Sequence, residues 1–293
     1  MRIAVTGAAG RLGRYVVTRA LQASHGVIAV DLPAVVPPAT ADVEWRAANL
    51  TELDAVRAAL SGADAVVHLA ALTSPRYAEP EVHRTNVGGT YNVLVAAEEH
   101  RLRAVCVASS VNAIGGIFSA NPRYDYFPVD EEHSSYCEDS YSLSKWLVEQ
   151  QMATFARRQP HVPFSALRLH ALRADITAAQ AAGDYDDQQE RRHLWGWTSF
   201  DSAAAACLLA VHRPAPGHSV YNIVGTRTAS TTPSAELARR WYPDVPLRTP
   251  LPGTSGFYST QKALAELGWE AGDEHPALSE RERAAGTVGR AQR

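Results

Sequence analysis

A tyrosine and a lysine stand four residues apart in the segment Tyr141-Ser-Leu-Ser-Lys145. Residues at positions i and i+4 of a helix lie on one face, so this spacing brings a phenol close to an ammonium group. We expect the cation to favour the phenolate and to lower the tyrosine pKa from its ordinary value of about 10. A phenol in that state can exchange a proton with an alcohol oxygen near neutral pH. The alternative is an ordinary surface pair on an amphipathic helix.

Lys145 is one of only two lysines in the chain, the other being Lys262. Arginine supplies almost every other cation, and its bulkier planar guanidinium could not easily replace an ammonium group at such a position. This rarity favours a specific role for Lys145.

Two further polar groups are predicted to meet this pair. Ser109 and Ser110 lie at the C-terminal edge of a strand predicted at residues 103–108, and Ser110 could hold a substrate oxygen opposite Tyr141. Asn86 lies in a long helix predicted at residues 81–100. Its amide could bind a backbone carbonyl or a water of a proton relay, or could simply be a polar group near the start of that helix. The set predicts proton transfer at a hydroxyl or carbonyl oxygen.

A glycine-rich loop near the N-terminus must position a second reactant. Gly7, Gly10 and Gly13 have a G-x2-G-x2-G spacing between a strand predicted at residues 2–5 and a helical pattern that runs to about residue 23. Such a loop lets backbone N–H groups approach a pyrophosphate at a helix N-terminus. The expected contacts in the loop are Gly7, Ala9, Gly10, Arg11, Leu12 and Gly13.

Asp31 ends the next predicted strand, residues 27–30. An acidic residue about 20 positions after the loop suits the adenosine ribose hydroxyls and repels a 2′-phosphate, so NAD is favoured over NADP. Arg11 competes with this interpretation because it could reach such a phosphate; it could also be a solvated helix-start residue or stack on adenine. The other expected cofactor contacts are Leu32, Asn49, Leu50, Leu69, Ala70, Ala71, Asn86, Tyr141 and Lys145.

The remaining elements alternate between strands and helices, which predicts an α/β fold with parallel strands. Further strands are predicted at 42–47, 65–71, 164–169 and 219–224, and further helices at 53–60, 141–157, 200–211, 235–241 and 260–267. Asp201-Ser202 is the expected N-cap of the helix at 200–211. His68 is interpreted as a core or strand-end histidine rather than a catalyst. We expect a cofactor-binding core at residues 1–165 that carries the Ser/Tyr/Lys groups, a mixed substrate lobe with returning core elements at 166–275, and a weakly ordered tail at 276–293.

Composition limits the partners. The net charge is −3 and the pI is about 6.4, which disfavours binding to nucleic acid or to an anionic membrane. Three cysteines without metal-type spacing predict neither a metal site nor disulfides. The chain opens on a predicted strand, and no apolar run approaches 18 residues, so we expect a cytoplasmic protein that acts on a small molecule.

The ordered set of motifs resembles the extended short-chain dehydrogenase/reductase superfamily, specifically its NAD-dependent epimerase/dehydratase group, over about residues 1–270. The motifs are residues 6–13, Asp31, residues 68–71, Asn86, Ser110 and the Tyr141/Lys145 pair, with similar C-terminal signatures at 220–225 and 267–269. The resemblance implies that Ser110, Tyr141 and Lys145 form a catalytic trio, with Asn86 in support. It also implies a Rossmann-type doubly wound parallel sheet with a small C-terminal substrate lobe, and homodimers through the helices near 87–100 and 141–157.

The substrate side departs from the nucleotide-sugar members of that group. They usually follow the strand that bears Arg168 with a Phe-Asn-Val-Tyr-Gly-Pro type of stretch, where this chain has Leu169-His-Ala-Leu-Arg173. Residues 192–199 instead resemble uronate dehydrogenases, which oxidise a free sugar acid at C1, and Arg192 would then clamp the substrate carboxylate. An acidic insertion before Arg192 is not part of that pattern, so Arg191 and Arg192 could also be solvated helix-end charges. The expected substrate contacts are Thr73, Ser74, Ser110, Asn112, His170 and Arg192.

The leading hypothesis is therefore an NAD-dependent oxidoreductase acting on a secondary or hemiacetal hydroxyl of a small, polar, sugar-like or uronate substrate. A nucleotide-sugar epimerase that keeps its NAD is the second hypothesis. Dehydration is disfavoured because no Asp or Glu follows Ser110. A tailoring enzyme for a larger natural product would use the same trio. A non-catalytic dinucleotide-binding regulator is a further alternative, but it would typically have lost Tyr141 or Lys145.

Overall fold

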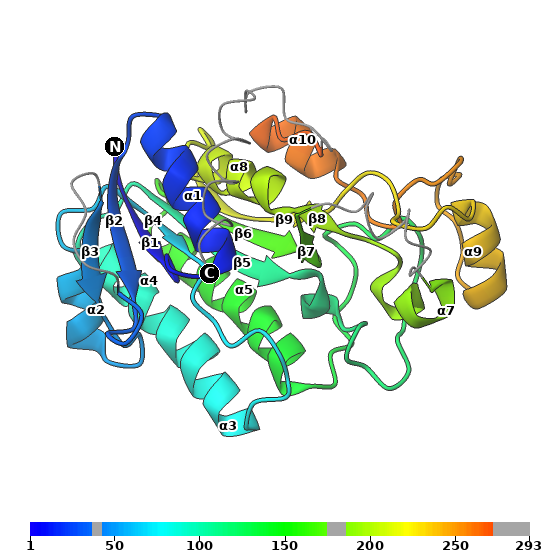
Figure 1. Ribbon diagram of the computed structural model, residues 1–293, viewed down its shortest axis with the longest axis horizontal. Helices are drawn as coiled ribbons and strands as arrows, with labels where there is room; N and C mark the ends of the chain where they lie inside the picture. Colours follow the sequence, from blue (N-terminus) through cyan, green and yellow to red (C-terminus); the bar gives the residue numbers. More distant parts are fainter. Residues whose placement is uncertain (37–42, 175–185, 272–293) are drawn as a thin grey trace, which may run out of the picture.

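The computed structural model describes residues 1–36, 43–174 and 186–271, and these form an α/β fold around one large sheet (Figure 1). Seven parallel strands lie in the order β3-β2-β1-β4-β5-β6-β9. They are β1 (Arg2–Thr6), β2 (Gly26–Asp31), β3 (Glu44–Ala47), β4 (Ala65–His68), β5 (Ala104–Ser110), β6 (Pro163–Leu169) and β9 (Gly217–Ile223). The predicted doubly wound parallel sheet is confirmed.

Helices cover both faces of the sheet (Figure 1). One core contains side chains of α1 (Arg11–Gln22), α8 (Phe200–Val211) and α10 (Gln261–Leu267). The other contains side chains of α2 (Leu53–Leu60), α4 (Gly89–Glu99) and α5 (Ser140–Arg158). Successive residues of a strand point to opposite faces, so Ile3 and Val5 pack in the first core and Ala4 in the second.

The order of the strands reverses between β1 and β4, because the chain adds β2 and β3 on one side of β1 and β4, β5 and β6 on the other. Ligands of open α/β sheets bind beyond the carboxyl ends of the strands at such a switch point. The central strands β4 and β5 are buried along their whole length, so these carboxyl ends are rigidly placed.

A third apolar cluster lies beyond the carboxyl end of β5 and β6. It joins Ile114, Phe127, Trp195 and Phe257 with Leu237 of helix α9 (Ser234–Trp241). The short elements around it are η2 (Val111–Ile114), β7 (Leu172–Arg173), α7 (Asp187–Glu190), η3 (Arg191–His193) and β8 (Thr198–Ser199). This cluster packs at the carboxyl ends of β5 and β6, on the other side of the switch point from the glycine loop.

Three predictions differ from the structure by more than a shift of one or two residues at the end of an element. Strand β4 ends at His68, and residues 69–71 continue as a loop. The helix predicted at 81–100 is α3 (Glu79–Val82), the π-helical turn η1 (His83–Gly88) and α4 in succession. The N-cap of α8 is Ser199, whose hydroxyl accepts a hydrogen bond from the N–H of Ser202, while Asp201 is paired with Arg19 of α1. Residues 276–293 and the larger part of the acidic insertion, 175–185, lie outside the described residues.

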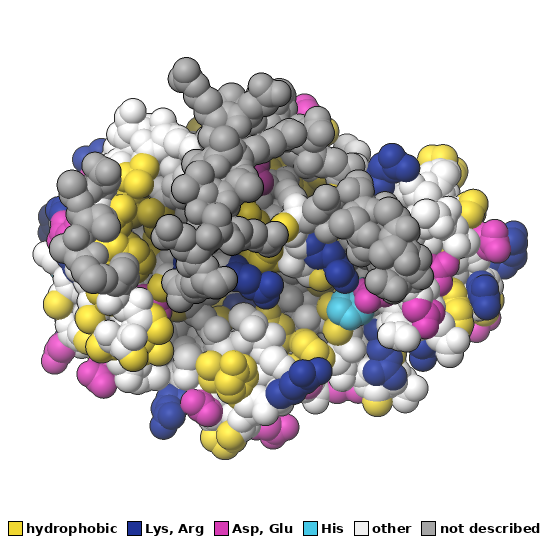
Figure 2. All heavy atoms as spheres, viewed as in Figure 1, with side chains coloured by type: hydrophobic (Ala, Val, Ile, Leu, Met, Phe, Trp, Pro, Cys, Tyr) yellow, Lys and Arg dark blue, Asp and Glu magenta, His cyan; other side chains and the backbone are white. Residues whose placement is uncertain are grey.

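The described surface carries charges of both signs. Figure 2 shows basic and acidic side chains interspersed over one face. Within the described ranges, no helix is both long enough and apolar enough to span a membrane.

Candidate active site

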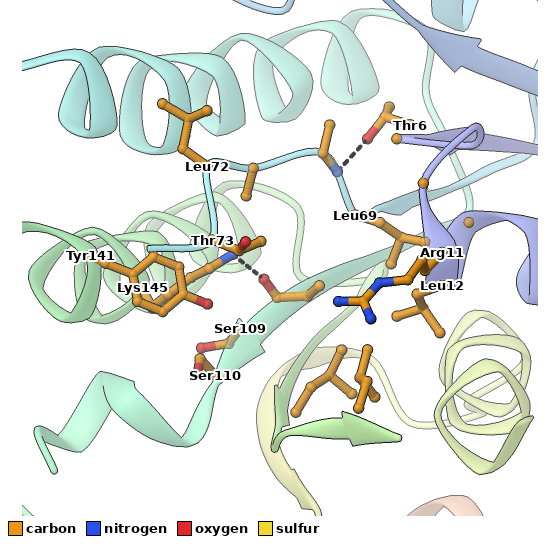
Figure 3. Close-up of a pocket in the computed structure, with 18 of the residues that line it drawn as sticks. Thr6, Arg11, Leu12, Leu69, Leu72, Thr73, Ser109, Ser110, Tyr141 and Lys145 are labelled. Atoms are coloured by element: carbon orange, nitrogen blue, oxygen red, sulfur yellow. Dashed lines mark hydrogen bonds between the residues drawn. The ribbon is translucent and has the colours of Figure 1, made fainter. Parts of the chain in front are cut away.

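A cavity of about 1000 Å³ opens at the carboxyl ends of the central strands. The glycine loop and Asp31 line one part of it, and Ser110, Tyr141 and Lys145 line another. Figure 3 shows Arg11 and Leu12 of the loop on one side of the cavity and Ser110, Tyr141 and Lys145 on the other. The cofactor motif and the predicted trio therefore share one cavity.

The glycine loop is packed too closely for side chains. Gly7 has a φ of +70°, and a Cβ there would lie 2.9 Å from the backbone N of Ala70. A Cβ on Gly13 would lie 2.2 Å from the carbonyl oxygen of Gly7. Glycine permits both contacts, so the loop can present its backbone to a ligand at the start of α1.

Asp31 is held at the end of β2 by the loop it faces. Its carboxylate accepts hydrogen bonds from the N–H of Ala9 at 2.9 Å and of Leu32 at 2.8 Å. A carboxylate has about four acceptor positions, so the remaining ones can bind the two hydroxyls of a ribose. The loop and Asp31 therefore fit the adenosine diphosphate part of a dinucleotide.

Arg11 extends from the glycine loop into the cavity (Figure 3). Its guanidinium carbon lies 5.4 Å from the ring centroid of Phe200 on α8. Phe200 in turn stacks on Tyr15, with 5.3 Å between ring centroids. The stacking partner of Arg11 in this structure is thus a phenylalanine of the protein itself.

The start of α5 places the Tyr/Lys pair. The side chain of Asp139 caps the helix by accepting a hydrogen bond from the N–H of Ser142 at 2.9 Å. Lys145 Nζ lies 5.8 Å from the ring centroid of Tyr141 and donates to the carbonyl oxygen of Ala108 at 2.7 Å. The Ser110 hydroxyl lies close enough to the phenol to lower the Tyr141 pKa. The three side chains are therefore assembled beside the end of β5.

The expected lowering of the Tyr141 pKa is wrong for this structure. Burial raises the pKa of Tyr141 to about 12, the hydroxyl of Ser110 opposes that rise, and Asp139 adds to it. Burial also lowers the pKa of Lys145 to about 8, against the effect of Glu149. The i+4 spacing gave the correct placement, but desolvation outweighs the influence of the ammonium on the phenol.

Asn86 lies behind the cavity, among residues that do not line it. Its Oδ1 accepts from the N–H of Leu72 at 2.8 Å, and its Nδ2 donates to the carbonyl oxygen of Leu72 at 2.9 Å. The same Nδ2 donates to the hydroxyl of Ser144 at 2.9 Å. Of the alternatives, Asn86 binds a backbone carbonyl, and it ties the segment after β4 to α5.

His68 is a core histidine, as interpreted. Nδ1 is hydrogen-bonded to Thr6 at 2.6 Å and Nε2 to Thr90 at 2.9 Å. Burial, with a smaller effect of Lys145, lowers its pKa to about 3, so it remains uncharged at neutral pH.

Four of the six expected substrate contacts line the cavity, namely Thr73, Ser110, Asn112 and His170. Ser74 and Arg192 are not among the lining residues. The Ser74 hydroxyl accepts from the backbone of Arg76 at 3.2 Å, and Arg192 donates to the carbonyl oxygen of Ala120 at 3.2 Å. The structure therefore does not bring Arg192 to the trio.

Both ring nitrogens of His170 are bound to the backbone. Nδ1 accepts from the N–H of Ala171 at 2.6 Å, and Nε2 is 2.8 Å from the carbonyl oxygen of His193. Burial lowers the pKa of His170 to about 3. His170 therefore offers a ligand its ring surface and fixes the position of His193.

Several lining residues were not predicted from the sequence. Phe118 packs edge-on to Tyr141 with 5.8 Å between ring centroids, after the turn at Gly115 and Gly116. His193 and Phe200 reach the cavity from the segment that follows the acidic insertion. The Gly-Gly turn was a signal that the chain reverses near Phe118, whereas no local pattern marks Phe200.

Comparison with known proteins agrees with this geometry. The family model described as "NAD dependent epimerase/dehydratase family" matches residues 3–175. A uronate dehydrogenase of Pseudomonas syringae pv. tomato is 28% identical over 78% of this chain and 76% of the relative. An L-arabinose 1-dehydrogenase (NAD(P)(+)) of Haloferax volcanii is 41% identical over 33% of this chain and 35% of the relative.

Solved structures show the same fold. MoeE5 in complex with UDP-glucuronic acid and NAD superposes with a TM-score of 0.69 at 24% identity, covering 94% of this chain and 95% of that one. The shared fold includes the sheet that places the cavity.

Proposed function

The chain belongs to the NAD-dependent epimerase/dehydratase family, and we propose that it oxidises a hydroxyl of a small sugar-like molecule with NAD as the hydride acceptor. The observation that carries this proposal is the single cavity that contains both the glycine loop with Asp31 and the Ser110, Tyr141 and Lys145 groups. A dinucleotide bound along the loop reaches from Asp31 toward the trio within that cavity.

Tyr141 is the proposed acid/base. It would take the hydroxyl proton of the substrate while Ser110 holds the reacting oxygen, and Lys145 would bind the ribose next to the nicotinamide. Bound NAD would supply the hydride acceptor for the substrate carbon that bears this hydroxyl, and its oxidised nicotinamide would bring positive charge toward the phenol. Added positive charge is what Tyr141 requires, because burial alone keeps its pKa near 12.

Asp31 supports NAD over NADP as the working cofactor. Its carboxylate is fixed by Ala9 and Leu32, so it cannot easily turn away from a 2′-phosphate. Arg11 is directed to Phe200 and is proposed to lie near the pyrophosphate.

A free sugar or sugar acid oxidised at its hemiacetal carbon is the proposed substrate class. The uronate dehydrogenase and L-arabinose 1-dehydrogenase relatives support it, as does the departure of Leu169–Arg173 from the nucleotide-sugar pattern. A carboxylate clamp by Arg192 would require that residue to leave the carbonyl oxygen of Ala120. Thr73 and Asn112 are placed to hold sugar hydroxyls.

Nucleotide-sugar epimerisation is the second candidate, because the matching family includes epimerases by its description. It requires that NADH be reoxidised within each turnover. The deciding experiment is absorbance at the reduced-nicotinamide band with NAD and a panel of aldoses, uronic acids and UDP-sugars. NADH formed in proportion to one free sugar supports dehydrogenation. Conversion of a UDP-sugar without net NADH would replace it with epimerisation.

A homodimer in the cytoplasm is the proposed working state. Tyr91 on α4 and Leu143 on α5 are 47% and 41% exposed, which supports an interface on these helices. Free Cys106, Cys137 and Cys207 suit a reducing compartment. Light scattering of the purified protein tests the dimer, with Tyr91→Glu as the variant expected to yield monomers.

A further inference from the structure

A buried carboxylate lies one helical turn beyond Lys145. Glu149 is 2% exposed, and its two oxygens accept hydrogen bonds from three donors. These are the hydroxyl of Ser109 at 2.6 Å and Nε and Nη2 of Arg168 at 2.9 Å and 2.8 Å. Arg168, itself 5% exposed, lies directly beside Ser109 in the pairing of β5 with β6. One carboxylate therefore joins α5 to two central strands.

This contact continues the arrangement of the proposed trio. Three consecutive residues at the end of β5 meet three residues of α5 that are spaced four apart. Ala108 accepts from Lys145 and Ser109 donates to Glu149, while the hydroxyl of Ser110 lies close enough to the phenol of Tyr141 to lower its pKa. Side chains at positions i, i+4 and i+8 lie along one helix face. The contacts of Lys145 and Tyr141 involve proposed reacting groups. The contact of Glu149 with Ser109 attaches the same strand end to α5 one helical turn further along.

The ion pair of Glu149 with Arg168 also influences the charge state of Lys145. Burial disfavours the ammonium, and the negative charge of Glu149 opposes that effect. Arg168 balances Glu149 from the far side. The other titratable or charged groups that face this cluster are Tyr141 from α5, His68 from β4, Glu131 and His133 from the loop before α5, His218 from β9 and Tyr258 from the segment before α10.

Those neighbours do not replace Glu149. Burial lowers the pKa of His68 to about 3 and that of His218 to about 4, so both are uncharged near neutral pH. Burial raises the pKa of Glu131, whose Oε1 is bound to the backbone N–H of Asn222 at 2.7 Å.

We propose that Glu149 and Arg168 are positioning residues for the reaction: they hold the end of β5 against α5 at the spacing the trio needs, and they keep a compensating negative charge one turn from Lys145. The catalytic part of this inference rests on the proposed function. The structural and electrostatic part concerns the chain alone and can be measured without turnover.

The first test is a titration of Lys145 by NMR. Because the chain has only two lysines, protein grown on isotope-labelled lysine gives signals from Lys145 and Lys262 alone, and Lys262→Arg assigns them. Glu149→Gln should move the Lys145 titration to lower pH, since two buried cations then lack their shared anion. Glu149→Gln/Arg168→Met removes both charges and should move the titration back toward that of the native protein. If the Lys145 titration does not move in Glu149→Gln, the proposal is overturned. If the double variant does not move the titration back, Arg168 has no part in setting the charge around Lys145.

Folding is checked on each variant by thermal unfolding and by calorimetric NAD binding. Replacing a buried ion pair by neutral groups is often tolerated, whereas removing one partner is costly, so the double variant is expected to fold even where Glu149→Gln does not. In that event Ser109→Ala becomes the second variant, because it retains both charges and removes one hydrogen bond of the cluster. It should lower kcat severalfold and leave the Lys145 titration unchanged; an unchanged kcat would contradict the positioning role.

The kinetic test separates positioning from mere stability. In Glu149→Gln, kcat at neutral pH should fall about tenfold, less than the 10²- to 10⁴-fold contribution of a positioned acid or base, because Tyr141 itself is retained. The KM for NAD should stay within about twofold, and the alkaline limb of the pH profile should move to lower pH. Loss of thermal stability with an unchanged kcat and pH profile would assign the pair a structural role only. Glu99→Gln, which breaks the exposed pair with Arg57, is the matched control and should leave all three kinetic quantities unchanged.

Discussion

The two ends of the cavity are built in different ways. At the proposed cofactor end, the cavity is lined by one continuous loop and by Asp31, which the loop itself holds through Ala9. At the substrate end, the lining residues come from separate segments, and side chains such as His170 are already bound to the protein backbone. The cofactor end is therefore specified by local sequence, and the substrate end by tertiary packing.

The largest expected effect tests the group that joins the two ends. Tyr141→Phe removes only the phenolic oxygen, so turnover should fall by about 10²- to 10⁴-fold, the usual contribution of a positioned acid or base. NAD binding measured by calorimetry should change little, because the glycine loop is untouched. Retention of near-native turnover would show that the proton is transferred by another group.

The next effect tests the cofactor end alone. Asp31→Asn keeps an acceptor for the N–H of Ala9 but removes the charge that faces the ribose. A charge-assisted hydrogen bond contributes roughly 1.5–3 kcal/mol, so the preference for NAD over NADP should fall by about tenfold to a hundredfold. The ratio of kcat/KM values for the two cofactors measures it. An unchanged ratio would place cofactor choice elsewhere, with Arg11 the first candidate.

A smaller effect is expected at the substrate end. His170→Ala frees the carbonyl oxygen of His193 and the N–H of Ala171, so the turn that carries His193 loses its support. The KM for the sugar should rise severalfold while the KM for NAD stays constant. If both KM values rose together, the two ends would not be independent.

The smallest effect at neutral pH concerns His68, beneath both ends. Its pKa is about 3 in the folded protein against about 6.5 in an unfolded chain, so the unfolded state binds more protons between these values. Its contribution to stability is present above pH 6.5 and is lost as the pH falls from about 6.5 toward 3. Denaturant unfolding at several pH values should show a shallower acid decline in His68→Gln than in the native protein, relative to each protein at pH 7. Parallel curves would assign the decline to other groups.

The sequence was most informative where function depends on short-range spacing. The glycine loop, Asp31 and the Tyr141/Lys145 pair were all placed in the cavity by motifs of a few residues each. Phe200 could not be found this way, because it reaches the cavity only through the packing of a distant segment against Arg11.

The electrostatic properties of the site were the second feature that the sequence could not predict. The i+4 spacing predicted the proximity of Tyr141 and Lys145, but the sign of the Tyr141 pKa shift depends on how deeply the fold buries it. Arg192 shows the same limit for substrate recognition. A pattern similar to uronate dehydrogenases suggested its role, whereas its guanidinium direction depends on the carbonyl oxygen of Ala120, 72 positions away in sequence.

The π-helical turn at His83–Gly88 has a consequence for how this enzyme could diversify. Through Asn86 it anchors Leu72 and, by way of Ser144, helix α5. Residues 73–78 lie between that anchor and α3, and Thr73 and Arg76 of this loop line the cavity without belonging to the trio. Insertions or substitutions in this loop can therefore change the lining of the cavity while the trio keeps its geometry. We expect changes of substrate specificity to arise here.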